Sequence, residues 1–307
     1  MQTMKNLYAT AIIIYLLTAS PAQPTYGNDG NLKEHHLLFN KLAKRLEADG
    51  LDKKYLERLF ARDELSLMPE TLALGLTIKE ARLNYSRFLQ QKSVKRAVDY
   101  LNKHITILKK VEKAFGVSSP VIVAILNVET ACGNYKGSVN TFNILATQAI
   151  SLEPEVYQQI RAKIPKKHRA ELSEQTIKDK LKKRSTRSYR ELKALIKYAH
   201  VNGIDPLSIH GSVEGAIGLP QFLPSNIKRH GFDGNGDGRI DLFHHHDAIA
   251  SIASYLKSYK WDENSDSESK QKVLLRYNYS NYYAKTVLKL SELISSQQSK
   301  GSGLNVN

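Results

Sequence analysis

Apolar residues recur at three- and four-residue spacing along much of this chain, with charged residues between them. That spacing places the apolar side chains on one face of an α-helix. No segment alternates apolar and polar residues convincingly enough to predict strands, and at most a short pair flanks the loop around Ile240. The sequence therefore predicts a mainly α fold, with helices at 36–47, 54–62, 77–91, 93–115, 190–201, 247–259 and 282–295.

A further predicted helix carries a glutamate in an unusual setting. Ser118-Ser119-Pro120 is a typical helix start, because it combines hydroxyl caps with a proline in the first turn. Residues 121–128 are almost wholly apolar, and Glu129 closes the run. A carboxyl there is expected to be desolvated, which raises its pKa and keeps it protonated near neutral pH, as a general acid requires. The alternative is a buried glutamate paired with a Lys or Arg elsewhere, and this helix alone does not decide between them.

Residues 1–22 read as a secretory signal peptide. Lys5 gives a positive start, residues 7–17 are apolar but too short to span a bilayer, and Ser20-Pro21-Ala22 offers small residues for cleavage. A retained N-terminal anchor is the alternative. Cys132 is the only cysteine, so no cysteine is available for acylation at the cleavage point and no internal disulfide can form. We expect an exported chain without a stable membrane anchor.

Positive charge is concentrated in one segment. The chain has a formal charge of +15, and residues 161–190 contain twelve Lys and Arg against three acidic residues. A charge run of this kind is usually a solvated helix face or a mobile insertion. Export argues against nucleic acid as the partner, and no DNA-recognition element is recognisable. An anionic polymer outside the cytoplasm, such as cell wall, fits better.

Residues 233–241 have the spacing of an EF-hand calcium loop. Oxygen-bearing side chains stand at positions 1, 3, 5 and 9, glycine at position 6 and isoleucine at position 8. The pattern fails at position 12, where His244 replaces the expected glutamate, and Asp247 is the nearest carboxylate that could close a longer loop. The alternative is a Gly- and Asp-rich turn that binds nothing. The neighbouring run 244–246 consists of histidines that point in diverging directions, which favours a solvated loop over a zinc or nickel site.

Two further segments have residues suited to a saccharide. Residues 211–225 are rich in small residues that let the backbone approach a ligand, and Ser212 and Gln221 offer hydrogen-bonding groups. Tyr277 and Asn278 combine an aromatic ring with an amide, which suits the apolar face and the hydroxyls of a sugar. Close helix packing is the alternative for the first segment. Cys132 is not expected to be a nucleophile, because no histidine is close to it in sequence.

Together these motifs resemble the lytic murein transglycosylase B family over roughly residues 38–293. The resemblance is carried, in order along the chain, by Val128-Glu129-Thr130, Gly133, Gly137, Asp205-Pro206-Leu207, Gly211-Ser212, the run 215–225, the loop 233–247, Trp261 and Tyr277-Asn278. It implies a lysozyme-like helical catalytic domain with an EF-hand-like calcium loop and additional helical segments. It also implies a lyase that cleaves the β-1,4 bond between N-acetylmuramic acid and N-acetylglucosamine and leaves a 1,6-anhydromuramoyl end.

The resemblance also assigns roles to residues. Glu129 is implied to act first as general acid and then as base, with no second carboxylate, unlike the two-carboxylate glycosidases. Saccharide binding is implied for Ser212, Gln221, Tyr277 and Asn278. A structural calcium ion is implied at Asp233, Asn235, Asp237, Arg239 and Asp247, with closure at position 15. No organic cofactor is expected, and the expected partner is the peptidoglycan glycan strand.

The expected plan is a catalytic region at 30–296, made of a helical part at about 30–110 and a lysozyme-like core at about 111–296. A basic insertion at about 151–190 and a disordered tail at 297–307 complete it. The chain departs from the family at Ile217, where methionine is usual, and at Phe243-His244-His245. We expect a periplasmic monomer in which the insertion attracts peptidoglycan carboxylates. A hydrolytic muramidase and a non-catalytic peptidoglycan-binding protein remain alternatives.

Overall fold

The computed structural model describes residues 29–78 and 83–302, with side chains from 37 to 78 and from 83 to 299. The predicted signal peptide at 1–22 lies outside these residues. The chain forms two compact units, each built from two separate stretches of sequence. The first unit comprises the described residues of 83–137 and 216–302, and the second comprises those of 29–78 and 138–215.

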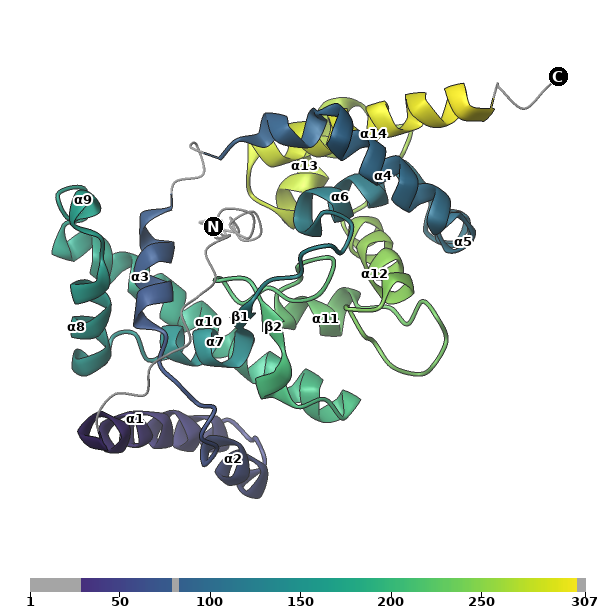
Figure 1. Cartoon of the computed structure of the whole chain (residues 1–307). Coiled ribbons are helices and arrows are strands. Elements are labelled where there is room, and N and C mark those ends of the chain that lie inside the picture. The colour runs from purple at the N-terminus through teal and green to yellow at the C-terminus, as the bar shows by residue number, and fades with distance from the viewer. Residues whose placement is uncertain (1–28, 79–82, 303–307) are drawn as a thin grey trace, which may run out of the picture. The chain divides into compact units, whose positions relative to one another are not determined.

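The first unit is a helical bundle around the apolar helix α6, whose neighbours include α4 and α14 (Figure 1). Nearly every residue of α6 is buried. A helix that is apolar on all sides is stable only when other elements surround it, as they do here. The elements of this unit are η3 (Tyr85–Leu89), α4 (Gln91–Lys103), α5 (Ile105–Phe115), α6 (Ser119–Thr130), α11 (Pro224–His230), α12 (His245–Ser258), α13 (Ser267–Tyr277) and α14 (Asn281–Ser302).

The chain turns sharply before α6. Gly116 ends α5 in the left-handed conformation, with φ of 70°, which glycine adopts without steric cost. Ser118 is the extended N-cap of α6 and Pro120 lies in its first turn, so the predicted helix start is confirmed. In the described part of the chain no single helix is long and apolar enough to span a membrane, and α5 and α6, which pass such a test only together, are bent by 115°.

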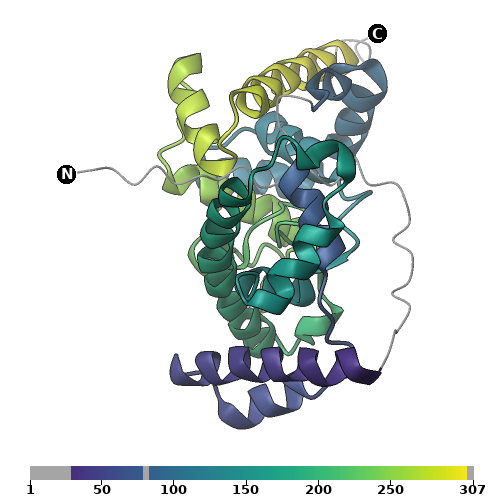
Figure 2. The ribbon, with the colours of Figure 1, turned by 90° about the vertical axis from the view of Figure 1, so that its left-hand side faces the viewer.

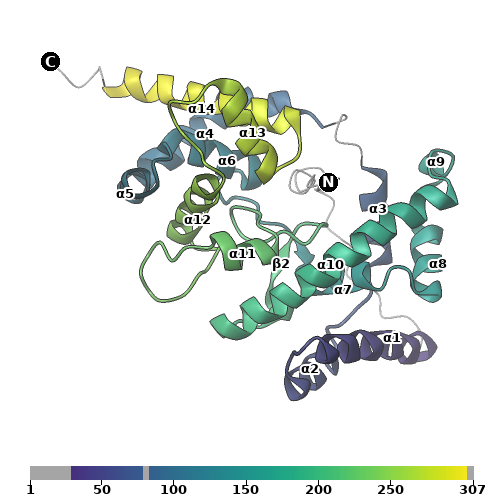
Figure 3. The same ribbon diagram turned by 180° about the vertical axis from the view of Figure 1, so that it is seen from behind.

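The second unit is organised by the long helix α10, which packs along α7 (Figures 2 and 3). A two-stranded antiparallel sheet pairs Val139 with Gly211 and Asn140 with His210. The elements are α1 (Asp29–Ala48), α2 (Lys53–Phe60), α3 (Pro69–Thr77), β1 (Val139–Asn140), α7 (Thr141–Ala149), α8 (Pro154–Lys163), α9 (Lys166–Arg169), α10 (Glu174–Asn202), η4 (Pro206–Ser208) and β2 (His210–Gly211).

The mainly α prediction is confirmed, but several of its details were wrong. Residues 77–91 contain the end of α3 and the short 3-10 helix η3 in place of one helix, and 93–115 is interrupted at His104. The strand pair lies at β1 and β2, and the described residues around Ile240 form no strand. The tail predicted as disordered from 297 instead continues α14 to Ser302.

The basic insertion is folded within the second unit. It forms α8, α9 and the first half of α10. At least six of the twelve cations between 161 and 190 form ion pairs with carboxylates. The charge run is therefore partly neutralised by the fold itself.

Candidate active site

Glu129 lies in the last turn of α6, in the interior of the first unit. Its side chain is 1% exposed. Of the buried carboxyls in the described part of the chain, it alone has neither oxygen in a hydrogen bond of good geometry, and the polar group that interacts with it is the Tyr283 hydroxyl. The alternative of a glutamate paired with a buried Lys or Arg is therefore not what the structure shows.

Burial changes the acidity of this carboxyl. Desolvation raises the pKa of Glu129 to about 8, while hydrogen bonding to the Tyr283 hydroxyl lowers the pKa by a smaller amount. A carboxyl with this pKa keeps its proton at neutral pH, because ionising it would place a charge in an apolar interior. This setting is consistent with the prediction that Glu129 is protonated near neutral pH.

Two tyrosines from the C-terminal part of the unit face the acid. Tyr283 is fully buried in the first turn of α14, and its ring stacks on that of Tyr277 with 6.2 Å between ring centroids. The Tyr277 hydroxyl donates a hydrogen bond of 2.6 Å to the carbonyl of Pro220. Burial and the carboxyl of Glu129 raise the pKa of both phenols well above the ordinary value, so that both stay protonated. They supply a neutral, partly aromatic wall beside the carboxyl.

The loop 217–222 is fixed against the end of α6. Thr130, next to the acid, donates from its hydroxyl to the carbonyl of Leu219 at 3.1 Å, and Ile217 pairs with Phe222 across the loop. Gly218 has φ of +71°, and a β-carbon there would lie 2.5 Å from that of Leu242. Only glycine fits both the conformation and the space, so this loop is held close to the acid by its sequence.

Two amide side chains of the first unit offer unpaired oxygens. Gln221 is 5% exposed, and its amide nitrogen donates to the carbonyl of Gly218 at 2.8 Å. Its oxygen, like the side-chain oxygen of Asn278, is buried without a hydrogen-bond partner among the described residues. Native proteins leave few buried polar atoms without a hydrogen bond. The two unpaired side-chain oxygens therefore indicate a place where a ligand binds. Gln221 and Asn278 directly follow Pro220 and Tyr277 in the sequence, and the hydrogen bond between Tyr277 and Pro220 brings the two segments together.

Ser212 belongs to the second unit. It is 1% exposed, and its hydroxyl accepts a hydrogen bond of 3.3 Å from the backbone N–H of Glu214. The Glu214 carboxylate is held by Arg184 at 2.5 Å and by Arg187, both on α10. Burial alone would raise the pKa of Glu214, but the two guanidinium groups outweigh it and hold the pKa below its ordinary value. Two cations of the basic segment therefore fix the loop that carries Ser212.

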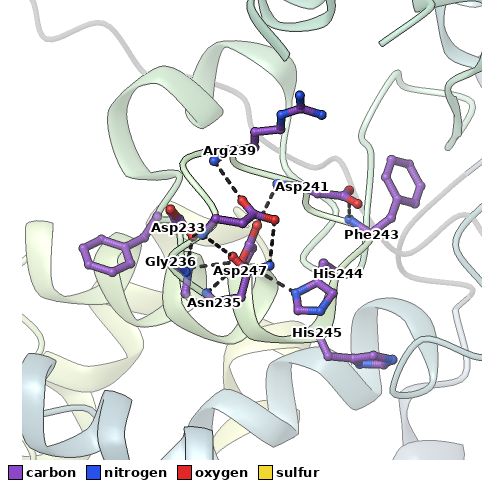
Figure 4. A network of polar contacts seen from close by, with 12 residues as sticks. Asp233, Asn235, Gly236, Arg239, Asp241, Phe243, His244, His245 and Asp247 are labelled. Carbon is purple, nitrogen blue, oxygen red and sulfur yellow. Dashed lines mark hydrogen bonds and ion pairs between the residues drawn. The ribbon is translucent and has the colours of Figure 1, made fainter. Parts of the chain in front are cut away.

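The predicted calcium loop is drawn together by hydrogen bonds to carboxylates (Figure 4). Asp233 accepts from the N–H groups of Gly236 and Gly238 at 2.6 and 2.7 Å. Asp247, which is fully buried, accepts from the N–H of Gly234 at 3.0 Å and from that of Asp241 at 2.8 Å. The carboxylate at position 15 thus closes the loop, although no three His, Cys, Asp or Glu side chains in the described residues are grouped as a metal site.

Cys132 and the histidines lie apart from this chemistry. Burial raises the pKa of the Cys132 thiol to about 12, which makes it a poor nucleophile. It packs near the end of α6, where it donates weakly to Asn127 at 3.6 Å. His245 stacks on His104 with 4.6 Å between centroids and accepts or donates to the Tyr100 hydroxyl at 2.9 Å. The prediction of a fully solvated histidine loop was therefore wrong for His245.

The sequence groups Tyr283 with the aromatic and amide residues suited to a sugar, but gives no sign that it lies against Glu129, where the structure places it. Its position six residues after Tyr277 is visible in the sequence, but that spacing crosses the turn between α13 and α14. The stacking of the two rings depends on how that turn folds.

Known proteins resemble this chain in sequence and in fold. The model of the family described as "Transglycosylase SLT domain" matches residues 35–271. The chain is 26% identical over 229 residues to the membrane-bound lytic murein transglycosylase B of Escherichia coli (strain K12), covering 71% of this chain and 55% of that protein. The chain thus spans about half the length of this curated relative.

Two solved structures share the fold. The Escherichia coli lytic transglycosylase SLT35 in complex with calcium is 21% identical, with a TM-score of 0.68 and coverage of 91% of this chain and 100% of that one. SltB3 from Pseudomonas aeruginosa in complex with NAG-anhNAM-pentapeptide is 18% identical, with a TM-score of 0.68 and coverage of 85% and 79%. At these identities the likeness concerns the fold.

Proposed function

The chain belongs to the transglycosylase SLT domain family, and on that basis we propose that it is a peptidoglycan lytic transglycosylase whose acid is Glu129. Its substrate is the β-1,4 bond between N-acetylmuramic acid and N-acetylglucosamine. The observation that carries the proposal is a fully buried carboxyl that has no cationic partner among the described residues and faces the hydroxyl of Tyr283, with a pKa raised to about 8 by burial. A group of this kind is poised to give up a proton and to take one back.

In the first step the protonated Glu129 donates its proton to the glycosidic oxygen, and the bond to the anomeric carbon breaks. The carboxylate left behind then accepts the proton of the muramoyl 6-hydroxyl, whose oxygen attacks the anomeric carbon. The product is a 1,6-anhydro ring, and the enzyme returns to its protonated state. A buried carboxylate is a strong base, because the apolar surroundings that raise its pKa favour reprotonation.

The decisive experiment is digestion of purified sacculi by the wild type and by Glu129→Gln. Glutamine keeps the size of the side chain but has no proton to transfer, so we expect activity to fall about a hundredfold or more. Unchanged activity in the variant would refute Glu129 as the acid, whereas a wild type that binds sacculi without cleaving them would favour a non-catalytic peptidoglycan-binding protein.

A hydrolytic muramidase is distinguished by the products. Water in place of the 6-hydroxyl would leave reducing muramic acid ends, whereas the proposed lyase leaves anhydro ends that are lighter by one water. Mass spectrometry of the same digest separates the two. The SltB3 complex with an anhydro-muramoyl ligand supports the lyase, and that support is by analogy of fold.

Saccharide binding is proposed for Gln221, Tyr277 and Asn278, and for Ser212 of the second unit. The unpaired oxygens of Gln221 and Asn278 suit the hydroxyl and acetamido N–H donors of an amino sugar. Replacing Asn278 by the isosteric leucine, or Gln221 by the unbranched methionine, should raise KM for glycan strands by about tenfold, because a lost hydrogen bond leaves a buried sugar donor unpaired.

We also propose that the loop 233–247 binds calcium for stability. Its ligands would be the side chains of Asp233, Asn235, Asp237 and Asp247 and the backbone carbonyl of Arg239, in agreement with the oxygen ligands that calcium prefers. The buried Asp247, already turned into the loop, and the calcium complex of SLT35 support this. Calcium at a hundred times its Kd should stabilise the fold by about 2.7 kcal/mol. Equal melting temperatures with calcium and with chelator would refute the site.

The substrate implies a place of action. Peptidoglycan lies outside the cytoplasmic membrane, so we propose that the chain is exported through residues 1–22 and acts in the periplasm. Fractionation of cells that express the full chain, with N-terminal sequencing of the mature protein, tests both the location and the cleavage after Ala22. A mature chain that still begins at residue 1 would favour the retained anchor.

A further inference from the structure

Two large aromatic side chains are exposed at the turn between α13 and α14. Tyr279 is 54% exposed and Tyr282 is 59% exposed, whereas Asn278 and Tyr283, which are next to them in sequence, are almost fully buried. An exposed tyrosine is not unusual by itself. Here, however, the two exposed rings are next in sequence to the buried Asn278 and Tyr283, and Tyr283 interacts with Glu129.

The ring of Tyr282 is held in place from one side. It stacks on Tyr85 of η3, with 6.0 Å between centroids and 22° between ring planes. Tyr85 is itself buried, and its hydroxyl lies 3.4 Å from that of Ser280 in the same turn. A ring fixed in this way loses little further freedom when a ligand binds, which favours affinity.

The stacked ring lies close to the acid. Tyr283 directly follows Tyr282 in the first turn of α14, and Tyr283 interacts with Glu129. Tyr85, on which the Tyr282 ring stacks, interacts with Tyr283 in turn, so two buried tyrosines connect the exposed ring to the acid. All of these residues belong to the first unit.

We propose that Tyr282, together with Tyr279, forms a stacking surface for a sugar ring of the glycan strand next to the bond that Glu129 cleaves. The ligand class is a neutral N-acetylated pyranose: its C–H face packs on the aromatic ring, and its hydroxyls reach the phenol oxygens and water. The surface extends the proposed function, on which it rests, from the scissile bond to a neighbouring sugar. An aromatic body with a polar edge is the side chain best suited to such a ligand.

A purely structural role for Tyr282, as a cover for Tyr85, makes a different prediction. In that case Tyr282→Ala would change the stability of the fold, and its effect would be the same for short and long glycans. A stacking role changes binding only for substrates long enough to reach the ring, and it tolerates any large flat side chain at this position.

The test uses the full chain with Tyr282→Ala, Tyr279→Ala and the ring-preserving Tyr282→Trp. The matched control is Tyr259→Ala, since Tyr259 is a 36% exposed tyrosine of the same unit that also contacts one tyrosine ring, that of Tyr255 at 4.9 Å. Steady-state kinetics are measured on long peptide-free glycan strands and on the shortest fragment that the wild type cleaves.

We expect Tyr282→Ala to raise KM for long strands by about twofold to tenfold, the range that aromatic stacking of about 0.5–1.5 kcal/mol corresponds to. The kcat should stay within about twofold, Tyr282→Trp should restore KM, and Tyr259→Ala should change neither. The shortest fragment should show no change in KM. An unchanged KM on long strands, or an equal loss on both substrates, overturns the inference.

Binding is also measured by calorimetry in the Glu129→Gln background, with the same long strands, so that turnover does not interfere. If the wild type neither binds nor cleaves the strands, the proposed function fails. If it does both and Tyr282→Ala binds as tightly as its parent, the stacking surface alone fails.

Discussion

Replacing Glu129, the proposed catalytic acid, should make this protein more stable, by an amount that depends on pH. In the folded protein the pKa of Glu129 is about 8, compared with the ordinary value of 4.5 that applies to the unfolded chain. Between these two pH values the unfolded state releases the proton and the folded state keeps it. Below pH 4.5 the titration of this carboxyl therefore does not change the free energy of unfolding. As the pH rises from 4.5 to about 8, the free energy of unfolding falls progressively.

The magnitude follows from the two pKa values. Each pH unit in this interval lowers the free energy of unfolding by about 1.36 kcal/mol. The loss reaches about 3 kcal/mol at pH 7 and levels off between about 4 and 5 kcal/mol above pH 8. Glutamine does not titrate, so Glu129→Gln escapes this loss. Relative to the wild type, the variant should gain about 1.36 kcal/mol for each pH unit between 5 and 8.

The assay is urea unfolding of both proteins at pH 5, 6, 7 and 8, with the free energies compared at each pH. Glu292→Gln is the control, because Glu292 is an exposed glutamate of the same unit whose side chain is 65% exposed. Its replacement should change stability by less than about 0.5 kcal/mol at every pH. A Glu129→Gln difference that is flat from pH 5 to pH 8 would mean that the folded protein already ionises this carboxyl at pH 5, and the argument for a protonated acid would fall.

Three further outcomes follow from the same structure. Because the acid must be protonated to start the reaction, kcat should decline as the pH rises through about 8, and a decline centred near 4.5 in a pH–rate profile would contradict the burial argument. Glu214→Ala should destabilise the fold by about 3–5 kcal/mol, since it leaves two largely buried guanidinium groups without their anion. Urea unfolding measures this, and a loss below about 1 kcal/mol would show that solvent already screens the cluster. The double variant Lys182→Glu, Lys183→Glu should weaken sacculus binding at low salt and flatten its salt dependence, because both lysines are exposed on α10. The matched variant Lys109→Glu, Lys110→Glu should do so less, and equal effects of the two would show that only total charge matters.

The predictions that the sequence supports best concern segments whose signal is local. The start of α6 is encoded in Ser118, which is the N-cap residue although its hydroxyl makes no capping hydrogen bond, and in Pro120 of the first turn. The apolar run that follows already requires burial of Glu129. The strand pair had no comparable signal. Each strand has two residues, too few for a period of two to show, and the partners Val139 and Gly211 are far apart in sequence. Their pairing is fixed by the tertiary structure.

The helix predicted at 77–91 failed for a related reason. Its apolar residues have helical spacing, but Tyr85 and Phe88 are three residues apart in a short 3-10 helix, where residues i and i+3 share a face. Periodicity over so few residues does not separate the two helix types. The short helix matters for the proposed stacking surface, because η3 presents Tyr85 to the ring of Tyr282.

The charge run at 161–190 predicts where a basic segment lies, but it does not predict what each of its cations does. The run from 161 to 190 predicts a solvated basic surface, and part of it is one. Arg184 and Arg187, however, turn inward and hold Glu214, two residues after Ser212 in the loop proposed to bind saccharide. A sequence cannot distinguish these arginines from their exposed neighbours, because their role depends on one carboxylate nearly thirty residues away. If that carboxylate fixes the Ser212 loop, part of the basic segment supports the substrate site from within, and only the remainder is free to attract an anionic polymer.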